Sequence, residues 1–295
     1  FGSLFSYPSI VISDFSQAVT VTVDLRTDSI IHLTIPQLKL QAVNLKTQQL
    51  PENLTYISKL LKLIITSFKS IPGLDISVSL KTDIQTPQTQ YQIGVGLLKA
   101  IVNLGKLKLD KQQLLAPLIQ INQNTVENVY QPDLAAMLYG QTIIFNPEDK
   151  KVSKLNNNHL SLLFIKLSDK SDILSLRKIS SLFDKHPQEL IDYKKYMMVL
   201  LGEATRIWPK QQSGSLGQLM IRNQKILQNM ALIDDHIHKL CVQIHLAGAD
   251  GAKISNYGQG IVALVPTGQE ELICWKCRHQ GIMVSVVEAK NSAKK

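Results

Sequence analysis

The order of the predicted elements indicates an α+β fold, with strands in the first third of the chain, helices in the middle and strands again near the end. Two patterns carry this prediction: segments rich in Val, Ile and Thr, and amphipathic segments whose apolar residues recur every three or four positions. With 295 residues, 44% of them hydrophobic, the chain is long enough to form two domains. We expect its strands to form a single antiparallel sheet.

The first half of the chain mixes short strands with helices. One helix begins at the N-cap Asn53 and places Ile57, Leu60 and Leu61 on one face. Asp110 is the predicted N-cap of a later helix. The predicted strands of this half are residues 9–13, 18–25, 29–35, 75–80 and 141–145, and the predicted helices are residues 53–71, 97–104, 111–121 and 132–139.

The most polar segment, residues 146–158, contains a proline, acids, lysines and three consecutive asparagines. We therefore predict an N-terminal domain of residues 1–152 and a C-terminal domain of residues 153–295. The clearest amphipathic helix of the second half begins at Ser213 or Ser215 and ends near Met230. Strands are predicted at residues 160–166, 260–266 and 282–287.

The composition excludes several classes of partner. Lys and Arg are scattered without a stripe of aromatic residues, so the +9 net charge predicts a preference for anionic small molecules and no nucleic acid. No apolar run approaches the roughly 20 residues that cross a bilayer, so no membrane partner is predicted.

Three cysteines predict a reducing, cytoplasmic location, and the pair Cys274 and Cys277 lacks a second pair for zinc. Because residue 1 is Phe and not Met, we expect an internal start.

Four segments, in order, resemble motifs of the GHMP small-molecule kinases, and of mevalonate kinases in particular. Residues 248–266, GADGAKISNYGQGIVALVP, are similar to the third family motif GAKLTGAGGGGCVIALVP, and residues 216–249 to the helix pair before it. Residues 131–145, QPDLAAMLYGQTIIF, resemble PSGVDNAVSTYGGTIVF. Residues 1–11 resemble the end of the first motif, and residues 83–104 the scaffold of the second.

The resemblance breaks down at the phosphate-binding loops. The second motif, usually PxxxGLGSSA, reads TPQTQY and keeps no glycine or serine; Gln90 and Tyr91 are expected to crowd the phosphate space. The third motif keeps only Gly258 and Gly260, and Asn122 stands where mevalonate kinases usually carry a magnesium-binding glutamate. Glycines matter in such loops because they let backbone N–H groups approach a phosphate.

The resemblance implies an N-terminal ribosomal-protein-S5-like domain and a C-terminal ferredoxin-like domain. It implies an ATP- and Mg²⁺-dependent kinase that phosphorylates the hydroxyl of a small anionic hydroxy acid, mevalonate by closest likeness, in isoprenoid precursor synthesis. Asp133 corresponds to the family's catalytic aspartate, although an aspartate there also caps a helix. The residues expected to contact the nucleotide are Thr89, Gln90, Ser255, Gly258 and Gly260.

Two other functions stay open at this point. The altered loops also fit a catalytically inactive GHMP homologue that acts as a binding or dimerisation module. A GHMP enzyme with changed chemistry, such as a decarboxylase, is a third candidate. No metal ligand is assigned from the sequence, and a homodimer is left open.

Overall fold

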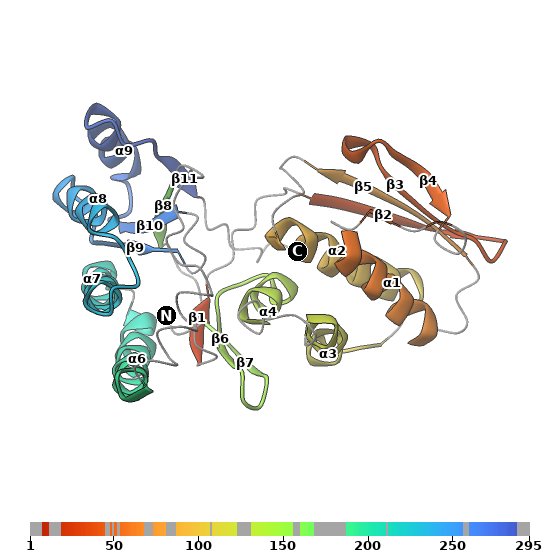
Figure 1. Cartoon of the computed structure of the whole chain (residues 1–295), viewed down its shortest axis with the longest axis horizontal. Coiled ribbons are helices and arrows are strands. Elements are labelled where there is room, and N and C mark those ends of the chain that lie inside the picture. Colours follow the sequence, from red (N-terminus) through yellow and green to blue (C-terminus); the bar gives the residue numbers. More distant parts are fainter. Residues whose placement is uncertain are drawn as a thin grey trace. The chain divides into compact units, whose positions relative to one another are not determined.

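The computed structural model describes residues 8–11, 19–44, 48, 50–51, 54–67, 73–80, 87–106, 108–122, 131–155, 160–167, 187–210, 212–255 and 260–287. The chain divides into two compact units (Figure 1). One unit consists of residues 16–140, and the other combines residues 1–15 with residues 141–295. The predicted N-cap Asn53 and the site residue Gly258 lie outside the described residues.

The unit of residues 16–140 contains a four-stranded sheet in the order β2-β5-β3-β4. Its strands β3 and β5 run parallel, and the other neighbours run antiparallel. The strands are β2 (Val19–Arg26), β3 (Ile31–Ile35), β4 (Leu40–Asn44) and β5 (Gly73–Leu80), with a short 3-10 helix, Pro36–Leu38, before β4. The alternation of buried and exposed residues along β5 confirms the pattern expected of a half-buried strand.

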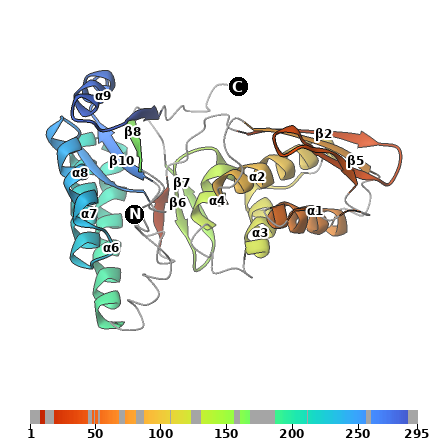
Figure 2. The same ribbon diagram turned by 45° about the horizontal axis from the view of Figure 1, so that its top comes forward.

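In the described part of this unit there are also four α-helices, and α1 and α2 lie against one face of its sheet (Figure 2). They are α1 (Thr55–Ser67), α2 (Pro87–Leu104), α3 (Lys111–Asn122) and α4 (Gln131–Tyr139). At the start of α3, the Gln113 N–H donates to Asp110 Oδ1 (2.7 Å) and the Asp110 N–H donates to Gln113 Oε1 (2.9 Å). This reciprocal pair is a capping box and confirms the predicted cap.

The second unit contains two antiparallel sheets, in the orders β1-β6-β7 and β11-β8-β10-β9. The strands are β1 (Ser9–Val11), β6 (Ile143–Asn146), β7 (Lys151–Lys154), β8 (Ser161–Lys166), β9 (Gly251–Ile254), β10 (Gly260–Val265) and β11 (Ser285–Val287). The helices are α6 (Pro187–Ile207), α7 (Ser213–Asn229), α8 (Asp235–Leu246) and α9 (Glu270–His279), with a 3-10 helix, Trp208–Lys210, after α6.

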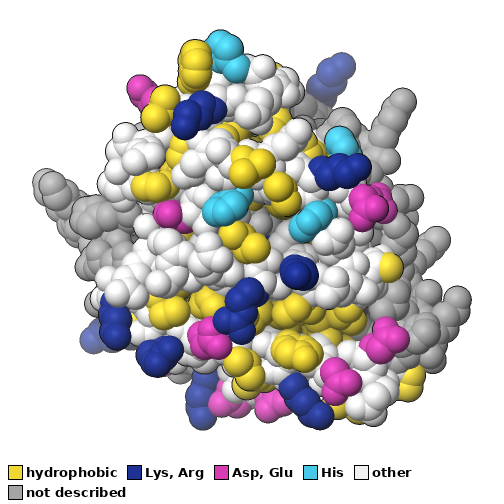
Figure 3. Space-filling view, turned by 90° about the vertical axis from the view of Figure 1, so that its left-hand side faces the viewer, with side chains coloured by type: hydrophobic (Ala, Val, Ile, Leu, Met, Phe, Trp, Pro, Cys, Tyr) yellow, Lys and Arg dark blue, Asp and Glu magenta, His cyan; other side chains and the backbone are white. Residues whose placement is uncertain are grey.

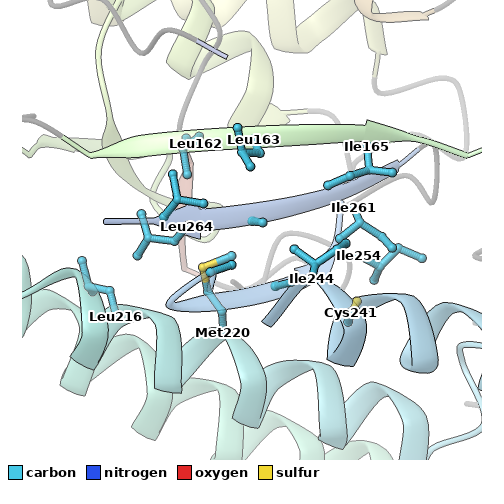
Figure 4. Packing of buried hydrophobic residues seen from close by; sticks show 14 of the residues in the cluster. Leu162, Leu163, Ile165, Leu216, Met220, Cys241, Ile244, Ile254, Ile261 and Leu264 are labelled. Carbon is cyan, nitrogen blue, oxygen red and sulfur yellow. The ribbon is translucent and has the colours of Figure 1, made fainter. Parts of the chain in front are cut away.

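The core of the second unit lies between its four-stranded sheet and the helices. Leu163 of β8, Leu264 of β10, Met220 of α7 and Ile244 of α8 point into this layer (Figure 4). The stripe of Leu and Met residues predicted for α7 is part of the core, as expected of an amphipathic helix. No described helix is long and apolar enough to cross a membrane.

The α+β class is confirmed, but the expectation of a single antiparallel sheet is wrong. The described strands form three separate sheets, and one contains the parallel pair β3 and β5. The alternation of apolar and polar residues along a strand indicates which of its residues are buried. It does not indicate which strands pair, because the pairing depends on how the connecting helices cross over.

The polar segment predicted as the domain boundary begins with a hairpin. Residues 147–150 form the turn between β6 and β7, where Asn146 Oδ1 accepts the Glu148 N–H and Lys150 has φ 54. The polar, breaker-rich composition therefore marks a tight turn at this point. The predicted boundary between residues 152 and 153 falls within β7, so the division into domains at that point stays a prediction.

Candidate functional site

Thr89 and Gln90, two of the predicted nucleotide-binding residues, lie in the first turn of α2. Pro87 opens this helix, where its fixed φ is favourable and its missing N–H costs nothing. The first N–H groups of a helix have no partner within it, and they form the positive end of its dipole. The first turn of α2 carries no acidic residue, so this end of the helix suits an anion.

Two side chains near the start of α2, those of Thr89 and Tyr91, point inward. Thr89 is 4% exposed and Tyr91 is 2% exposed. The Tyr91 ring packs edge-on against the Tyr56 ring of α1, with the ring centroids 5.1 Å apart. The packing of Tyr91 against α1 differs from the expectation that this side chain would fill the space in front of the helix. Gln90 is half-buried.

Asp133 lies in the first turn of α4 and is half-buried. A carboxylate at this position interacts favourably with the positive end of the helix dipole. Gly140 ends α4 with φ 66, and its N–H donates to the Ala136 carbonyl (2.9 Å). A glycine suits this left-handed position at the end of a helix, so both ends of the short α4 are defined by the local sequence.

Two lysines that the sequence analysis did not single out hold the other end of α4. Lys111 Nζ of α3 donates to the Tyr139 carbonyl (2.9 Å), and Lys99 Nζ of α2 lies 3.4 Å from the Met137 carbonyl. Burial, and then the charge of Lys111, lower the pKa of Lys99. Cations near the last carbonyls of a helix are stabilising. Lys99 and Lys111 therefore fix the position of α4 within its unit, and with it Asp133.

Ser255 and Gly260 lie at the two ends of the loop between β9 and β10. The Ser255 N–H donates to the Gly260 carbonyl (2.8 Å) and closes the base of this loop. A Cβ atom at Gly260 would lie 2.4 Å from the Phe164 ring and 2.5 Å from the Ile165 carbonyl oxygen. Gly260 is therefore needed for the packing of β10 against β8, whatever its role toward a ligand.

The buried amide of Gln224 anchors β9 directly before this loop. The Ile254 N–H donates to Gln224 Oε1 (2.9 Å), and Gln224 is 2% exposed. Its helix, α7, approaches β9 closely, since a Cβ atom at Gly251 would lie 2.1 Å from the Gly217 carbonyl oxygen. Gln224 gives no signal in the sequence, because nothing in a helical pattern distinguishes a glutamine that reaches a strand 30 positions further along the chain.

Lys253, which is half-buried, and the buried Cys241 are two titratable groups beside the same loop. Lys253 Nζ donates to the Ile254 carbonyl (2.6 Å). Burial lowers the pKa of Lys253 to about 8 and raises the pKa of Cys241 to about 12. The ammonium group therefore sits in surroundings that favour the neutral amine, as expected for a lysine removed from water.

The predicted site residues thus fall into two groups. Thr89, Gln90 and Asp133 lie in the unit of residues 16–140, on two helices that contact each other. Ser255 and Gly260 lie in the other unit, at the base of one loop. Among the described residues, no three His, Cys, Asp or Glu side chains are arranged to hold a metal ion, and the three cysteines are free and buried.

This architecture is the fold of the GHMP kinases, as the motifs predicted. The mevalonate kinase of Methanococcus jannaschii shares it with a TM-score of 0.73 and 16% identity, over 97% of this chain and 92% of that one. The mevalonate kinase of L. major, solved with R-mevalonate, has a TM-score of 0.70 and 17% identity, over 100% and 94% of the two chains. The galactokinase of Lactococcus lactis has a TM-score of 0.70 and 10% identity, over 96% and 88%.

These likenesses cover nearly the whole of both chains, so the full fold and not one domain is shared. No protein-family model and no curated protein sequence matches this chain.

Proposed function

We propose that this chain is an ATP- and Mg²⁺-dependent kinase that phosphorylates the hydroxyl group of a small anionic hydroxy acid, with mevalonate as the first candidate. The observation that carries the proposal is the position of Asp133 in the first turn of α4, within a segment that resembles the family's catalytic motif. The near-complete overlap with solved mevalonate kinases supports the same chemistry.

The nucleotide phosphates are proposed to bind at the start of α2. Binding of the phosphates there would depend on backbone groups, because the first turn of an 18-residue helix offers N–H donors and carries no carboxylate to repel an anion. The loss of glycines from this motif removes flexibility, but it leaves these donors in place. The Thr89 side chain is buried, so the proposal does not depend on its hydroxyl group.

Mg²⁺ usually binds through one or two carboxylates together with phosphate oxygens, so a cluster of three protein ligands is not required. Asp133 is the acidic residue that this proposal assigns to the reaction. MgATP would supply the transferred phosphoryl group, and positioning accounts for most of the catalysis in such reactions. Asp133 would accept the proton of the substrate hydroxyl. Lys99 and Lys111 would keep its helix in place.

The first experiment measures thermal unfolding with and without MgATP. A ligand present at one hundred times its dissociation constant stabilises the folded state by about 2.7 kcal/mol. We expect MgATP to raise the melting temperature, and ADP formation to begin when mevalonate or a related hydroxy acid is added. A melting temperature unchanged by millimolar MgATP would exclude the kinase and leave the inactive relative.

The second experiment replaces Asp133 by Asn. Removal of a general base costs about 10²- to 10⁴-fold in rate, so phosphate transfer should fall by that factor while the MgATP shift remains. Asp110→Asn is the matched control, because Asp110 is also an acid at the start of a helix in this unit but only caps α3. Equal activity of the two variants would remove Asp133 from the proposed role.

A further inference from the structure

Strand β2 is the longest edge strand that the structure describes. It is the last strand on one side of its sheet (Figure 1), and it pairs with β5 over eight consecutive residues without a bulge. An edge strand presents a row of unpaired backbone N–H and C=O groups, with which another strand can pair. None of the described strands pairs with this side of β2.

β2 lacks the features that usually protect such an edge. Natural proteins prevent pairing at sheet edges with lysine, proline, bulges or very short strands. The sequence of β2, VTVTVDLR, contains no lysine and no proline, and its Val and Thr residues favour an extended chain. A Cβ atom at Gly96 of α2 would lie 2.8 Å from Val21 Cγ2. This contact of α2 involves a side chain on the helix-covered face of the sheet and not the backbone of the edge.

Negative charge gathers at the end of β2, on the sheet face away from the helices. Asp24 lies directly opposite Asp75 of β5. Arg26 forms ion pairs with Asp75 (2.8 Å) and with Asp28 (2.7 Å), and His32 Nδ1 lies 3.3 Å from Asp75 Oδ1. With His32 neutral, the three carboxylates and one guanidinium carry a net charge of −2, in a chain whose net charge is +9.

Asp24 is the carboxylate of this group that no described base contacts, and it is exposed. On the helices of the second unit, acidic and basic side chains lie side by side (Figure 3), and Glu203 pairs with Arg222 (2.6 Å). Like charges directly opposite each other on neighbouring strands are unfavourable. A basic side chain on the free side of Asp24 would therefore offset its repulsion with Asp75.

The other face of the sheet is apolar at this end of β2. Leu25 is 55% exposed, although its partner on β5, Leu74, is buried. Successive residues of a strand point to opposite faces of the sheet. A strand added beside β2 would therefore meet the carboxylate of Asp24 on one face and the side chain of Leu25 on the other.

We propose that the free edge of β2 binds an extended segment of a partner protein in which basic residues alternate with apolar ones. The segment pairs with the backbone of β2 and extends the sheet by one strand, with a basic side chain beside Asp24 and an apolar one beside Leu25. In binding of this kind, main-chain hydrogen bonds supply affinity and alternate side chains supply specificity. The proposal concerns a partner protein and is independent of the proposed catalytic activity.

The probe that tests this proposal is a short, fluorescently labelled peptide in which lysine alternates with valine. It should bind the full chain, as measured by fluorescence anisotropy, and should protect backbone amides of β2 from hydrogen exchange. The same peptide with glutamate in place of lysine should bind about tenfold more weakly, because its charges repel Asp24. A lysine peptide N-methylated at every residue should not bind, because it has no backbone N–H to donate.

Three results would overturn the proposal. The first is no binding of the lysine peptide at millimolar concentration, which would mean that another part of the chain covers the edge. The second is equal binding of the lysine and glutamate peptides. The third is binding of the N-methylated peptide as tight as that of the unmodified one.

Asp24→Lys exchanges the charge at the edge and should reverse the preference, so that the glutamate peptide binds more tightly than the lysine peptide. The variant should fold, because a lysine opposite Asp75 replaces a repulsive cross-strand pair with an attractive one. Glu148→Lys is the matched control, since Glu148 is exposed in the turn between β6 and β7 and its replacement changes the net charge equally. If Glu148→Lys reversed the preference as well, the peptides would be responding to net charge and the proposed site would be wrong.

Discussion

At the scale of single residues, burial controls the chemistry beside the β9–β10 loop. Lys253 has an ordinary pKa of 10.5, which burial lowers to about 8, so at neutral pH the folded chain carries an ammonium group in surroundings that disfavour its charge. Cys241 has the opposite behaviour, since burial raises its pKa to about 12 and keeps the thiol neutral. A lysine of this kind reduces stability when charged and ceases to do so once it loses its proton.

The free energy of unfolding should therefore rise between pH 8 and pH 9. In this window the unfolded chain keeps the Lys253 proton and the folded chain loses it, so stability increases with pH, by about 1 kcal/mol. The unfolded Cys241 thiol, with an ordinary pKa of 9.0, begins to ionise in the same window while the folded one does not, which opposes part of this increase and outweighs it at higher pH. Urea unfolding at pH 8 and pH 9 measures the effect, and Lys253→Met should abolish it. If the free energy of unfolding of Lys253→Met rose by the same amount between pH 8 and pH 9, the pH dependence would belong to another titratable group.

At the scale of elements, the close approach of α7 to β9 positions the loop that carries Ser255 and Gly260. A Cβ atom at Gly217 would lie 2.3 Å from the backbone carbonyl carbon and oxygen of Asp250. Real Cβ atoms do not approach backbone that closely, and backbone atoms cannot move aside as the end of a side chain can. The glycine is therefore required by packing, although it stands inside a helix where glycine is otherwise unfavourable.

Gly217→Ala should consequently lower the free energy of unfolding by about 1 to 3 kcal/mol, the usual cost of overpacking. The matched control is Gly202→Ala on α6, where a Cβ atom would find nothing within 4 Å. That change should raise the free energy of unfolding by about 0.5 to 1 kcal/mol, because alanine favours a helix more than glycine does. Chemical denaturation of both variants makes the comparison, and a Gly217→Ala chain as stable as Gly202→Ala would show that α7 and β9 can separate without cost.

At the scale of the whole molecule, the N-terminal segment belongs with the second half of the chain. β1 pairs with β6, and Ile10 is buried in the same apolar cluster as Leu163 and Ile165 of β8. Ile144 of β6 packs against that cluster as well. The unit of residues 16–140 is thus inserted between two parts of the other unit.

A fragment of residues 16–140 should therefore fold by itself and unfold cooperatively on heating, because its sheet and helices enclose their own core. A fragment of residues 1–152 carries in addition β1, β6 and half of β7, without the cluster that buries Ile10 and Ile144. It should bind more of a hydrophobic dye and aggregate more readily. Circular dichroism and dye fluorescence of both fragments make the test, and cooperative unfolding of residues 1–152 alone would support a boundary near residue 152.

The sequence by itself determined the fold class and most of the elements. Apolar periodicity placed α1 and α7, and the acid before α3 identified its cap, because these signals act within one turn of a helix. The local motif around Asp133 also indicated the start of α4. Such features are predictable because their causes lie within a few residues of one another.

Only the tertiary structure decided which elements meet. Gln224 reaches Ile254, and Lys99 reaches Met137, across 30 and 38 positions of the chain. The burial of Tyr91 against Tyr56, the three separate sheets and the pairing of β1 with β6 likewise depend on long-range packing. A contact between distant segments leaves no periodic pattern in either of them, because it is set by the geometry of the folded chain and not by local preference.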